Sequence, residues 1–264
     1  MWLLIDGNSW FCRDFFAGPN GQYGQQGNAD AWSIFLNRVR SMTAKFSFDR
    51  VIVAFDSSPS FRHELYAGYK AGRKPKPETF QIVLDKLKLE LMKMEGVETS
   101  IVKGLEADDV VASFVEDAKD EGIKAVIAST DKDLFQLIRD GHVSQATSVW
   151  RDEQSNIHCE WMTAKLLLET HGVTPEQWIE YRMLVGDSSD NIPGCVGIGP
   201  KAAVKVLSSC KCLAAFWENP HAANLTSSLT TKIVNFKQEA DFWRRLITLR
   251  RTRESVSSEE LVNG

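Results

Sequence analysis

The sequence predicts an α/β fold with a mostly parallel central sheet flanked by helices. Three short apolar runs, at residues 2–6, 50–56 and 124–133, each carry an aspartate at or near their end. Runs that are apolar throughout suit strands buried on both faces of a parallel sheet. Helical patterns separate them, at about 29–46, about 80–95 and 106–121. This alternation indicates right-handed crossovers and an open sheet.

The pattern changes to helices alone after about residue 160. Three helical segments, beginning near residues 161, 174 and 200, are separated by Gly, Pro and Asn. We therefore expect an α/β part over 1–160 and a helical part over 161–253. The polar end of the chain, 254–264, is expected to be a flexible tail.

Bulk composition favours an intracellular, cytoplasmic protein. The five cysteines are an odd set, and the only close pair, Cys210 and Cys212, lacks the usual spacing of a zinc half-site. Reduced thiols are therefore expected. No apolar run approaches the roughly 20 residues that span a bilayer, so no membrane contact is expected. The net charge of −4 does not by itself indicate a nucleic-acid partner. The local distribution of charge is more informative, because an average over the chain can hide a basic face.

Acidic residues gather where predicted strands end and helices begin. Asp6, Asp56 and Asp131 fall at carboxyl ends of strands, where ligands bind in open α/β sheets. Glu106 and Asp109, at i and i+3, share a helix face, and Asp108 lies between them. No basic residue follows them closely enough to pair. The full set is Asp6, Asp56, Glu106, Asp108, Asp109, Asp131, Asp133, Asp187 and Asp190.

Taken singly, these carboxylates are explained by helix capping. Taken together on one sheet edge, they repel one another and have raised pKa values unless cations neutralise them. Hard oxygen ligands select Mg²⁺ or Mn²⁺ rather than zinc. Two such ions about 4 Å apart activate water and stabilise the leaving oxygen of a phosphodiester. The sequence therefore predicts a two-ion centre, with some carboxylates binding through water.

A basic segment follows the second predicted strand. Between residues 62 and 76 it carries Arg62, Lys70, Arg73, Lys74 and Lys76 against the single acid Glu64. Tyr66 and Tyr69 lie among these cations, and Pro75 and Pro77 prevent a continuous helix. Basic side chains neutralise phosphates and tyrosines stack on bases, as in single-strand binders. A solvated surface loop is the alternative.

A glycine-rich hairpin lies within 186–207. Gly194, Gly197 and Gly199 precede Pro200, where a helix is expected to begin. Glycines let the backbone approach a partner, and a helix start offers N–H groups to phosphate. Lys201 and Lys205 stand one turn apart on that helix. A tight interhelical turn is the alternative, and the seven basic residues of 232–253 are equally well explained as a solvated helix face.

These motifs together resemble the 5′ nuclease family, which includes the 5′–3′ exonuclease domain of bacterial DNA polymerase I and phage flap endonucleases. The resemblance rests on "LLIDGNSW", "VIVAFDSS", "FRHELYAGYKAGR", "GLEADDVVASF", "ASTDKDLFQL" and "VGDSSDNIPGCVGIGPKAA", in that order. It implies a PIN-like core, a helical arch at about 61–95 and a helix–three-turn–helix module. One departure is Gly68, where the family often has proline, and it is expected to loosen the arch.

The resemblance also implies an activity and residue roles. The family cleaves 5′ flaps, resects duplexes from 5′ ends and removes primer RNA by Mg²⁺-dependent hydrolysis. Asp6, Asp56, Glu106, Asp108 and Asp109 resemble one metal group. Asp131, Asp133, Asp187 and Asp190 resemble the other. Tyr69 resembles the arch aromatic, and Lys70 and Arg73 the arch cations that act in catalysis beside Asp6, Asp56 and Asp131.

The remaining expectations concern partners. The hairpin at 194–199 resembles a segment that binds duplex DNA together with K⁺. Branched or 5′-ended duplex DNA and RNA–DNA hybrids are the expected substrates of a monomer, in a bacterial cytoplasm or a phage-infected cell. Three rivals stay open: a non-catalytic DNA-binding paralogue, a PIN-type ribonuclease, and a phosphatase. The phosphatase would need an acid two residues after Asp6, where Asn8 stands.

Overall fold

The computed structural model describes residues 1–16 and 27–252. Its core is one six-stranded sheet in the order β3-β2-β1-β4-β5-β6. The strands are β1 (Trp2–Asp6), β2 (Arg50–Phe55), β3 (Val97–Ile101), β4 (Ala125–Ala128), β5 (Val143–Arg151) and β6 (Ile157–Met162). All neighbours pair in parallel except β5 and β6. The predicted mostly parallel α/β fold is confirmed.

Helices cover both faces of the sheet because its central strands are apolar on both sides. Leu3 and Ile5 of β1 face a core shared with α1 (Gly7–Phe16), α2 (Ala31–Lys45) and α4 (Glu78–Met92). Trp2 and Leu4 face the opposite core, which is shared with α5 (Ala107–Asp120) and the short helix η3 (Asp133–Leu137). Alternate residues of one strand therefore serve two layers.

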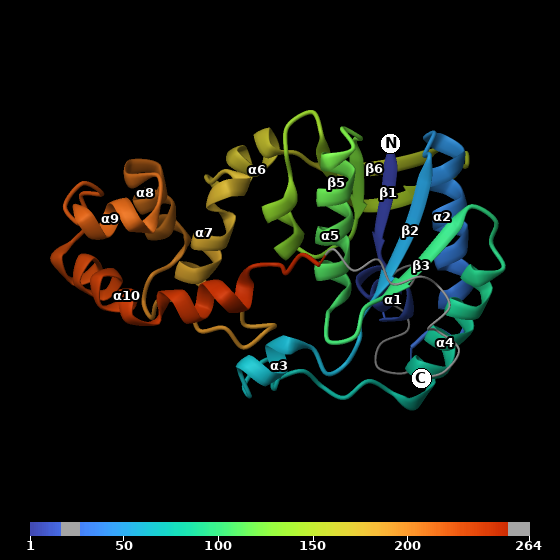
Figure 1. Ribbon diagram of the computed structural model, residues 1–264, viewed down its shortest axis with the longest axis horizontal. Helices are drawn as coiled ribbons and strands as arrows, with labels where there is room; N and C mark the ends of the chain where they lie inside the picture. Colours follow the sequence, from blue (N-terminus) through green and yellow to red (C-terminus); the bar gives the residue numbers. More distant parts are fainter. Residues whose placement is uncertain (17–26, 253–264) are drawn as a thin grey trace.

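The second part is helical and has its own core (Figure 1). It consists of α6 (Ala164–His171), η4 (Pro175–Gln177), α7 (Trp178–Val185), α8 (Pro200–Cys210), α9 (Leu213–Glu218) and α10 (Ser227–Ile247). Trp178, Leu207 and Phe216 are fully buried in that core, which also takes in Tyr69 and Phe135 from the α/β part. The two parts are thus packed together through side chains of both. The predicted tail, 254–264, lies outside the described residues.

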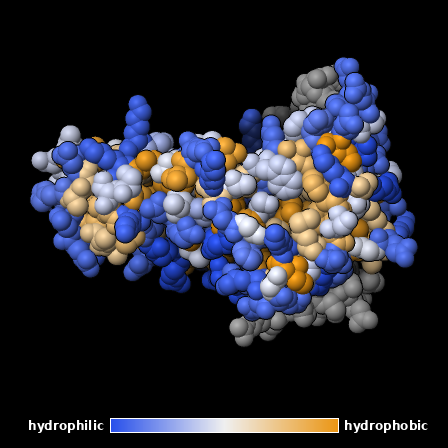
Figure 2. Space-filling view, turned by 90° about the horizontal axis from the view of Figure 1, so that it is seen from above, coloured by the Kyte–Doolittle hydropathy of each residue, from blue (hydrophilic) through white to orange (hydrophobic). Residues whose placement is uncertain are grey.

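Hydrophilic and hydrophobic residues are mixed on the face of the protein that Figure 2 shows, with hydrophilic residues most frequent along its outline. No helix within 1–16 and 27–252 is long and apolar enough to cross a membrane. All five cysteines are free, in agreement with the expected reduced thiols.

The segment between β2 and α4 holds the basic residues of the predicted arch. It begins with α3 (Phe61–Leu65), runs through turns at 66–77 and enters α4 after Pro77. The segment is fastened to the helical part, because Asn191 Nδ2 donates to the Gly68 carbonyl over 2.8 Å and Lys70 N donates to the Asp190 carbonyl. A Cβ on Gly68 would lie 2.5 Å from the Tyr66 ring, so this glycine lets the turn close tightly.

Candidate metal centre

The carboxyl ends of β1 and β2 bring Asp6 and Asp56 to one edge of the sheet. Asp6 is nearly buried, and its oxygens accept bonds from Ser9 N and Ser129 Oγ, both over 2.9 Å. Asp56 follows β2 directly, and its backbone N–H donates to Asn8 Oδ1 over 2.9 Å. Parallel pairing of β1 with β2 and β4 aligns these strand ends, as the sequence predicts.

Three carboxylates of the site share one bonding pattern. An oxygen of Asp56 accepts from Ala107 N, an oxygen of Asp108 from Asp109 N, and an oxygen of Asp131 from Asp133 N, each over 2.8 Å. The second oxygen of each has no hydrogen-bond donor among the residues that the structure describes. One oxygen fixes the side chain, and the other is left for a ligand.

A cleft of about 640 Å³ collects these groups. Six of the nine predicted carboxylates line it: Asp6, Asp56, Glu106, Asp108, Asp131 and Asp187. Asp133 and Asp190 lie beside it, with Asp187 in a cluster whose ligand oxygens are within 4.8 Å of one another. Six cations also line the cleft: Arg13, Lys70, Arg73, Lys76, Lys132 and Arg182. The predicted convergence of the acids is therefore present.

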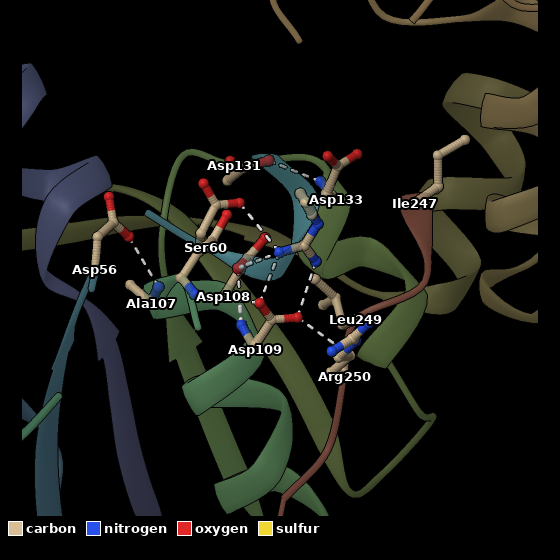
Figure 3. A network of polar contacts seen from close by, with 12 residues as sticks. Asp56, Ser60, Ala107, Asp108, Asp109, Asp131, Asp133, Ile247, Leu249 and Arg250 are labelled. Carbon is tan, nitrogen blue, oxygen red and sulfur yellow. Dashed lines mark hydrogen bonds and ion pairs between the residues drawn. The ribbon is translucent and has the colours of Figure 1, made fainter. Parts of the chain in front are cut away.

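Asp109 does not belong to the cleft, and Arg62 explains why. Arg62 is 2% exposed, and its guanidinium donates to both oxygens of Asp109, over 2.6 and 2.8 Å. Asp109 also accepts from the backbone of Arg250 over 2.7 Å and from that of Glu106 (Figure 3). No oxygen of this fully buried side chain is left without a donor, so Asp109 is engaged by Arg62 and by backbone N–H groups rather than held free for a metal ion.

Two expectations are corrected by that contact. Arg62 was expected to face DNA, but it is buried beneath the cleft and also donates to Glu106 over 3.0 Å. The expectation that Glu106 and Asp109 lack a basic partner was wrong as well. The partner lies 44 residues before Glu106, on α3, so no local reading of the sequence could show it.

Burial and mutual repulsion raise the pKa values of four of the carboxyls that line the cleft, Asp6, Asp56, Asp108 and Asp131. The pKa of Asp6 rises to about 6 through burial and the nearby charge of Asp56. Burial and Asp6 raise the pKa of Asp131, and burial raises that of Asp108 well above its ordinary value. Burial alone would raise the pKa of Glu106 too, but Lys70 and Arg62 hold it below its usual range.

The donor set fits a hard divalent cation. Asp6, Asp56, Asp108 and Asp131, which we call the cleft carboxylates, offer only oxygen ligands. Their oxygens do not form a set of three within 4.8 Å, since in the described part of the chain only Asp133, Asp187 and Asp190 do. Mg²⁺ retains several waters when it binds to proteins, so wider spacing suits a partly hydrated ion.

We expect divalent ions to stabilise the protein more at about pH 8 than at about pH 5. Because the folded pKa of Asp6, about 6, lies above its unfolded value, folded protein keeps a proton that unfolded protein loses. The free energy of unfolding of the metal-free protein therefore falls as the pH rises from the unfolded pKa of Asp6, 3.8, to its folded pKa of about 6. Bound Mg²⁺ offsets this loss, because it favours the ionised carboxylates. At 100 times its Kd the gain is about 2.7 kcal/mol. Melting temperatures with Mg²⁺ and with EDTA at both pH values measure it, and equal shifts would contradict it.

The predicted arch residues contact the metal-site acids directly. Lys70 Nζ lies 2.6 Å from Glu106 Oε1, and Arg73 Nη2 lies 2.5 Å from Asp190 Oδ1. Tyr69 is 5% exposed, and its hydroxyl donates to Glu106 over 2.8 Å and to Asp190 over 3.1 Å. In this structure Tyr69 therefore positions two carboxylates, and its ring is not presented for stacking. Lys76 lines the cleft, and Lys74 is exposed.

The glycine hairpin leads into α8 as the sequence predicts. Gly194 has φ +66°, and a Cβ there would lie 2.5 Å from Gly186 N, so close backbone packing explains this glycine. Gly199 caps α8 with open space around it, and Lys201, the second residue of α8, is exposed. Lys205 Nζ donates to the Asn224 carbonyl over 2.5 Å. The interhelical-turn explanation holds for Gly194, while Gly199 and Lys201 are free to meet a partner.

The residues that line the cleft without having been predicted as site residues include Thr130 and three cations, Arg13, Lys132 and Arg182. Arg182 donates to Asp133 over 3.0 Å and forms an ion pair with Asp187. The sequence did offer a sign that Arg182 belongs to the site. It lies one helical turn before Gly186, so its side chain can reach the acidic residues of the loop that follows. Arg13 and Lys132 carry no such signal, since α1 and the loop after β4 meet only in the folded chain.

The site gathers acids at the carboxyl edge of a parallel sheet and borders them with cations, an arrangement typical of metal-dependent nucleases. The family models of the 5′-3′ exonuclease agree, with the N-terminal resolvase-like domain matching residues 1–169 and the C-terminal SAM fold matching 173–262. The chain belongs to the 5′-3′ exonuclease family, as the motifs predicted.

Known relatives support this membership. DNA polymerase I of Thermus thermophilus is 40% identical over 206 residues, which are 78% of this chain and 23% of that protein. DNA polymerase I of Deinococcus radiodurans is 35% identical, over 87% of this chain and 23% of that protein. The chain thus spans about a quarter of the length of these relatives.

Solved structures share the fold. A T5 5′-exonuclease structure with bound zinc has a TM-score of 0.72 at 22% identity, covering 94% of this chain and 89% of that one. A bacteriophage T5 flap endonuclease in complex with DNA and metal ions has a TM-score of 0.68 at 23% identity, covering 94% and 88%.

Proposed function

We propose that this protein is a structure-specific 5′ nuclease that hydrolyses DNA phosphodiesters at 5′ flaps and 5′ ends with Mg²⁺ or Mn²⁺. The observation that carries the proposal is the pattern at Asp56, Asp108 and Asp131. Each has one oxygen fixed by a backbone N–H and one oxygen left at a cleft bordered by cations. Family membership and the DNA and metal ions bound by the T5 enzyme support it.

Different residues would bind the metal ion, the scissile phosphate and the duplex. A bound divalent ion would supply a water of lowered pKa and stabilise charge on the phosphate. Asp56, Asp108 and Asp131 would hold it, with Asp6 and Glu106 beside them. Two ions, with the second near Asp133, Asp187 and Asp190, extend the proposal.

Lys70 and Arg73 would stabilise the charge of the scissile phosphate. Burial alone would lower the pKa of Lys70, but Glu106 and Asp190 raise it, so its ammonium is charged at neutral pH. Both side chains line the cleft and contact acids of the site, so a phosphate there meets them directly.

Duplex binding is proposed for the other basic residues and the hairpin. Lys74 and Lys76 lie on the arch segment, and Gly197, Gly199 and Lys201 lie at the hairpin and the start of α8. Contacts of this kind fix a duplex without reading its sequence. We extend the proposal to K⁺ at 194–199, to RNA–DNA hybrids as substrates and to a cytoplasmic monomer.

The test is product mapping on one labelled 5′-flap duplex, with and without Mg²⁺. We expect cuts near the junction of single strand and duplex, only with the ion. Uniform degradation of single-stranded DNA would contradict structure-specific cleavage. Cleavage of single-stranded RNA that survives deletion of 186–207 would favour the PIN-type ribonuclease instead. The phosphatase alternative lacks its second acid, because Asn8 stands two residues after Asp6 and its Oδ1 accepts a bond from the Asp56 backbone.

We expect Lys70→Met to slow flap cleavage by about 10²–10³-fold, as when a donor that stabilises transition-state charge is removed. Affinity for the flap in EDTA should change little, because one phosphate contact among several is lost. Single-turnover rates and fluorescence anisotropy measure the two effects. Lys119→Met is the matched control, since its ammonium pairs with Glu116 on an exposed face of α5. A rate equal to that of the control would contradict a role for Lys70.

A further inference from the structure

A guanidinium lies inside the most compact group of acids in the described chain. Arg182, on α7, is buried to 14% side-chain exposure. Its Nε lies 3.0 Å from Asp133 Oδ1, its Nη2 pairs with Asp187 Oδ2, and its Nη1 donates to the Gly186 carbonyl over 3.4 Å. Two of its three nitrogens therefore contact acids of the group, and the third contacts the backbone just before Asp187.

The three acids of that group have cationic or hydroxyl partners on most of their oxygens. We call Asp133, Asp187 and Asp190 the Arg182 cluster, since their ligand oxygens lie within 4.8 Å of one another. The second oxygen of Asp187 accepts from Ser189 N and Oγ, both over 2.7 Å. Asp190 accepts from Arg73 and Tyr69. Only Asp133 keeps an oxygen without a donor among the described residues.

The cleft carboxylates are arranged in the opposite way. Their nearest guanidinium or ammonium contact in the described part of the chain is 3.8 Å, between Asp108 and Arg62. Three of them keep an oxygen free of donors, whereas two arginines serve the three acids of the Arg182 cluster. These arginines explain why the oxygens of the cluster can lie so close together. Carboxylates at such short distances repel one another unless cations pair with them.

We propose that the guanidinium of Arg182 is the resident cation of this cluster. It occupies the position at which a second divalent ion would bind. The free protein therefore binds one divalent ion tightly, at the cleft carboxylates, and a second only weakly. A second ion meets the fixed positive charge of Arg182 and has to displace its bonds to Asp133 and Asp187. The inference rests on the proposed function and refines its two-ion form.

The same guanidinium joins the two parts of the protein. Asp133 begins η3 in the α/β part, whereas Arg182 and Asp187 lie on α7 and the loop after it. The Arg182 cluster is thus assembled across the junction by an ion pair of the chain itself. Arg182 is a positioning residue, and its removal is expected to change metal stoichiometry.

The experiment is a Mn²⁺ titration of full-length protein without DNA, followed by electron paramagnetic resonance of free Mn²⁺. We expect one tight site in the wild type. Arg182→Gln removes the charge and keeps hydrogen-bonding ability, and it should tighten the second site at least about 10-fold. Arg182→Lys keeps the charge and should behave as wild type. Arg50→Gln is the matched control, because it removes an arginine–carboxylate pair with Glu98 far from the cleft.

Two results would overturn the proposal. One is a wild type with two sites of similar affinity, which needs no variant. The other is a folded Arg182→Gln protein, verified by circular dichroism, with an unchanged second site. If the wild type does not cleave a flap, the proposed function is contradicted. The number of tight Mn²⁺ sites still tests the role of Arg182, because the titration does not depend on cleavage.

Discussion

Asp131→Ala is expected to reduce flap cleavage by about 10³-fold, because a metal ligand that stabilises several kcal/mol of transition-state charge is lost. Asp131 lines the cleft, and one of its oxygens is fixed by Asp133 N while the other has no donor among the described residues. Burial and Asp6 raise its pKa, so ionised Asp131 needs a cation nearby. Single-turnover cleavage of a labelled 5′ flap under saturating Mg²⁺ measures the effect.

DNA binding separates this outcome from unfolding and from the non-catalytic alternative. Removing one negative charge from the cleft should leave affinity for the flap in EDTA equal or slightly higher. Asp85→Ala is the control, because the Asp85 side chain is 56% exposed on α4. Retention of full activity by Asp131→Ala would rule out Asp131 as a metal ligand. A wild type that binds the flap but never cuts it would support the DNA-binding paralogue.

Arg62→Met is expected to lower the free energy of unfolding by about 3–5 kcal/mol, the cost of breaking a buried ion pair by removing one partner. Asp109 has no exposed surface, and without Arg62 its charge would be buried with backbone donors only. The bond from Arg62 to the Leu246 carbonyl, which ties α3 to the end of α10, is lost as well. Equilibrium denaturation in EDTA measures the change without metal binding.

Two further variants give this expectation its control. Arg50→Met removes a more exposed ion pair with Glu98 and should cost no more than about 1 kcal/mol. The double variant Arg62→Met, Asp109→Leu should recover part of the loss, since the unpaired charge is gone. If Arg62→Met and Arg50→Met cost the same, the buried network around Asp109 does not stabilise the fold as the contacts indicate.

Apolar patterning predicted the elements that build the centre of the fold. The runs at 2–6, 50–56 and 124–133 contain β1, β2 and β4. The periodic segments at about 29–46 and 106–121 contain α2 and α5, and the segment at about 80–95 covers α4 except for its first residues. β3, β5 and β6 were not predicted, because polar residues interrupt their apolar pattern, as in "VETSI" of the edge strand β3 and "VSQATSVWR" of β5. The arch segment is non-helical at 66–77, where Pro75 and Pro77 stand.

The meeting of the acids at the carboxyl edge of the sheet could be predicted from the sequence, because parallel pairing places the ends of successive strands together. How each acid is used depends on contacts that form only in the folded chain. Nothing in the sequence around Asp109 and Asp187 sets them apart from Asp108 and Asp131. In the structure, however, Arg62 of α3 binds Asp109 and Arg182 of α7 binds Asp187. The physical reason is that a carboxylate's role depends on its nearest charges, and those come from residues distant in the chain.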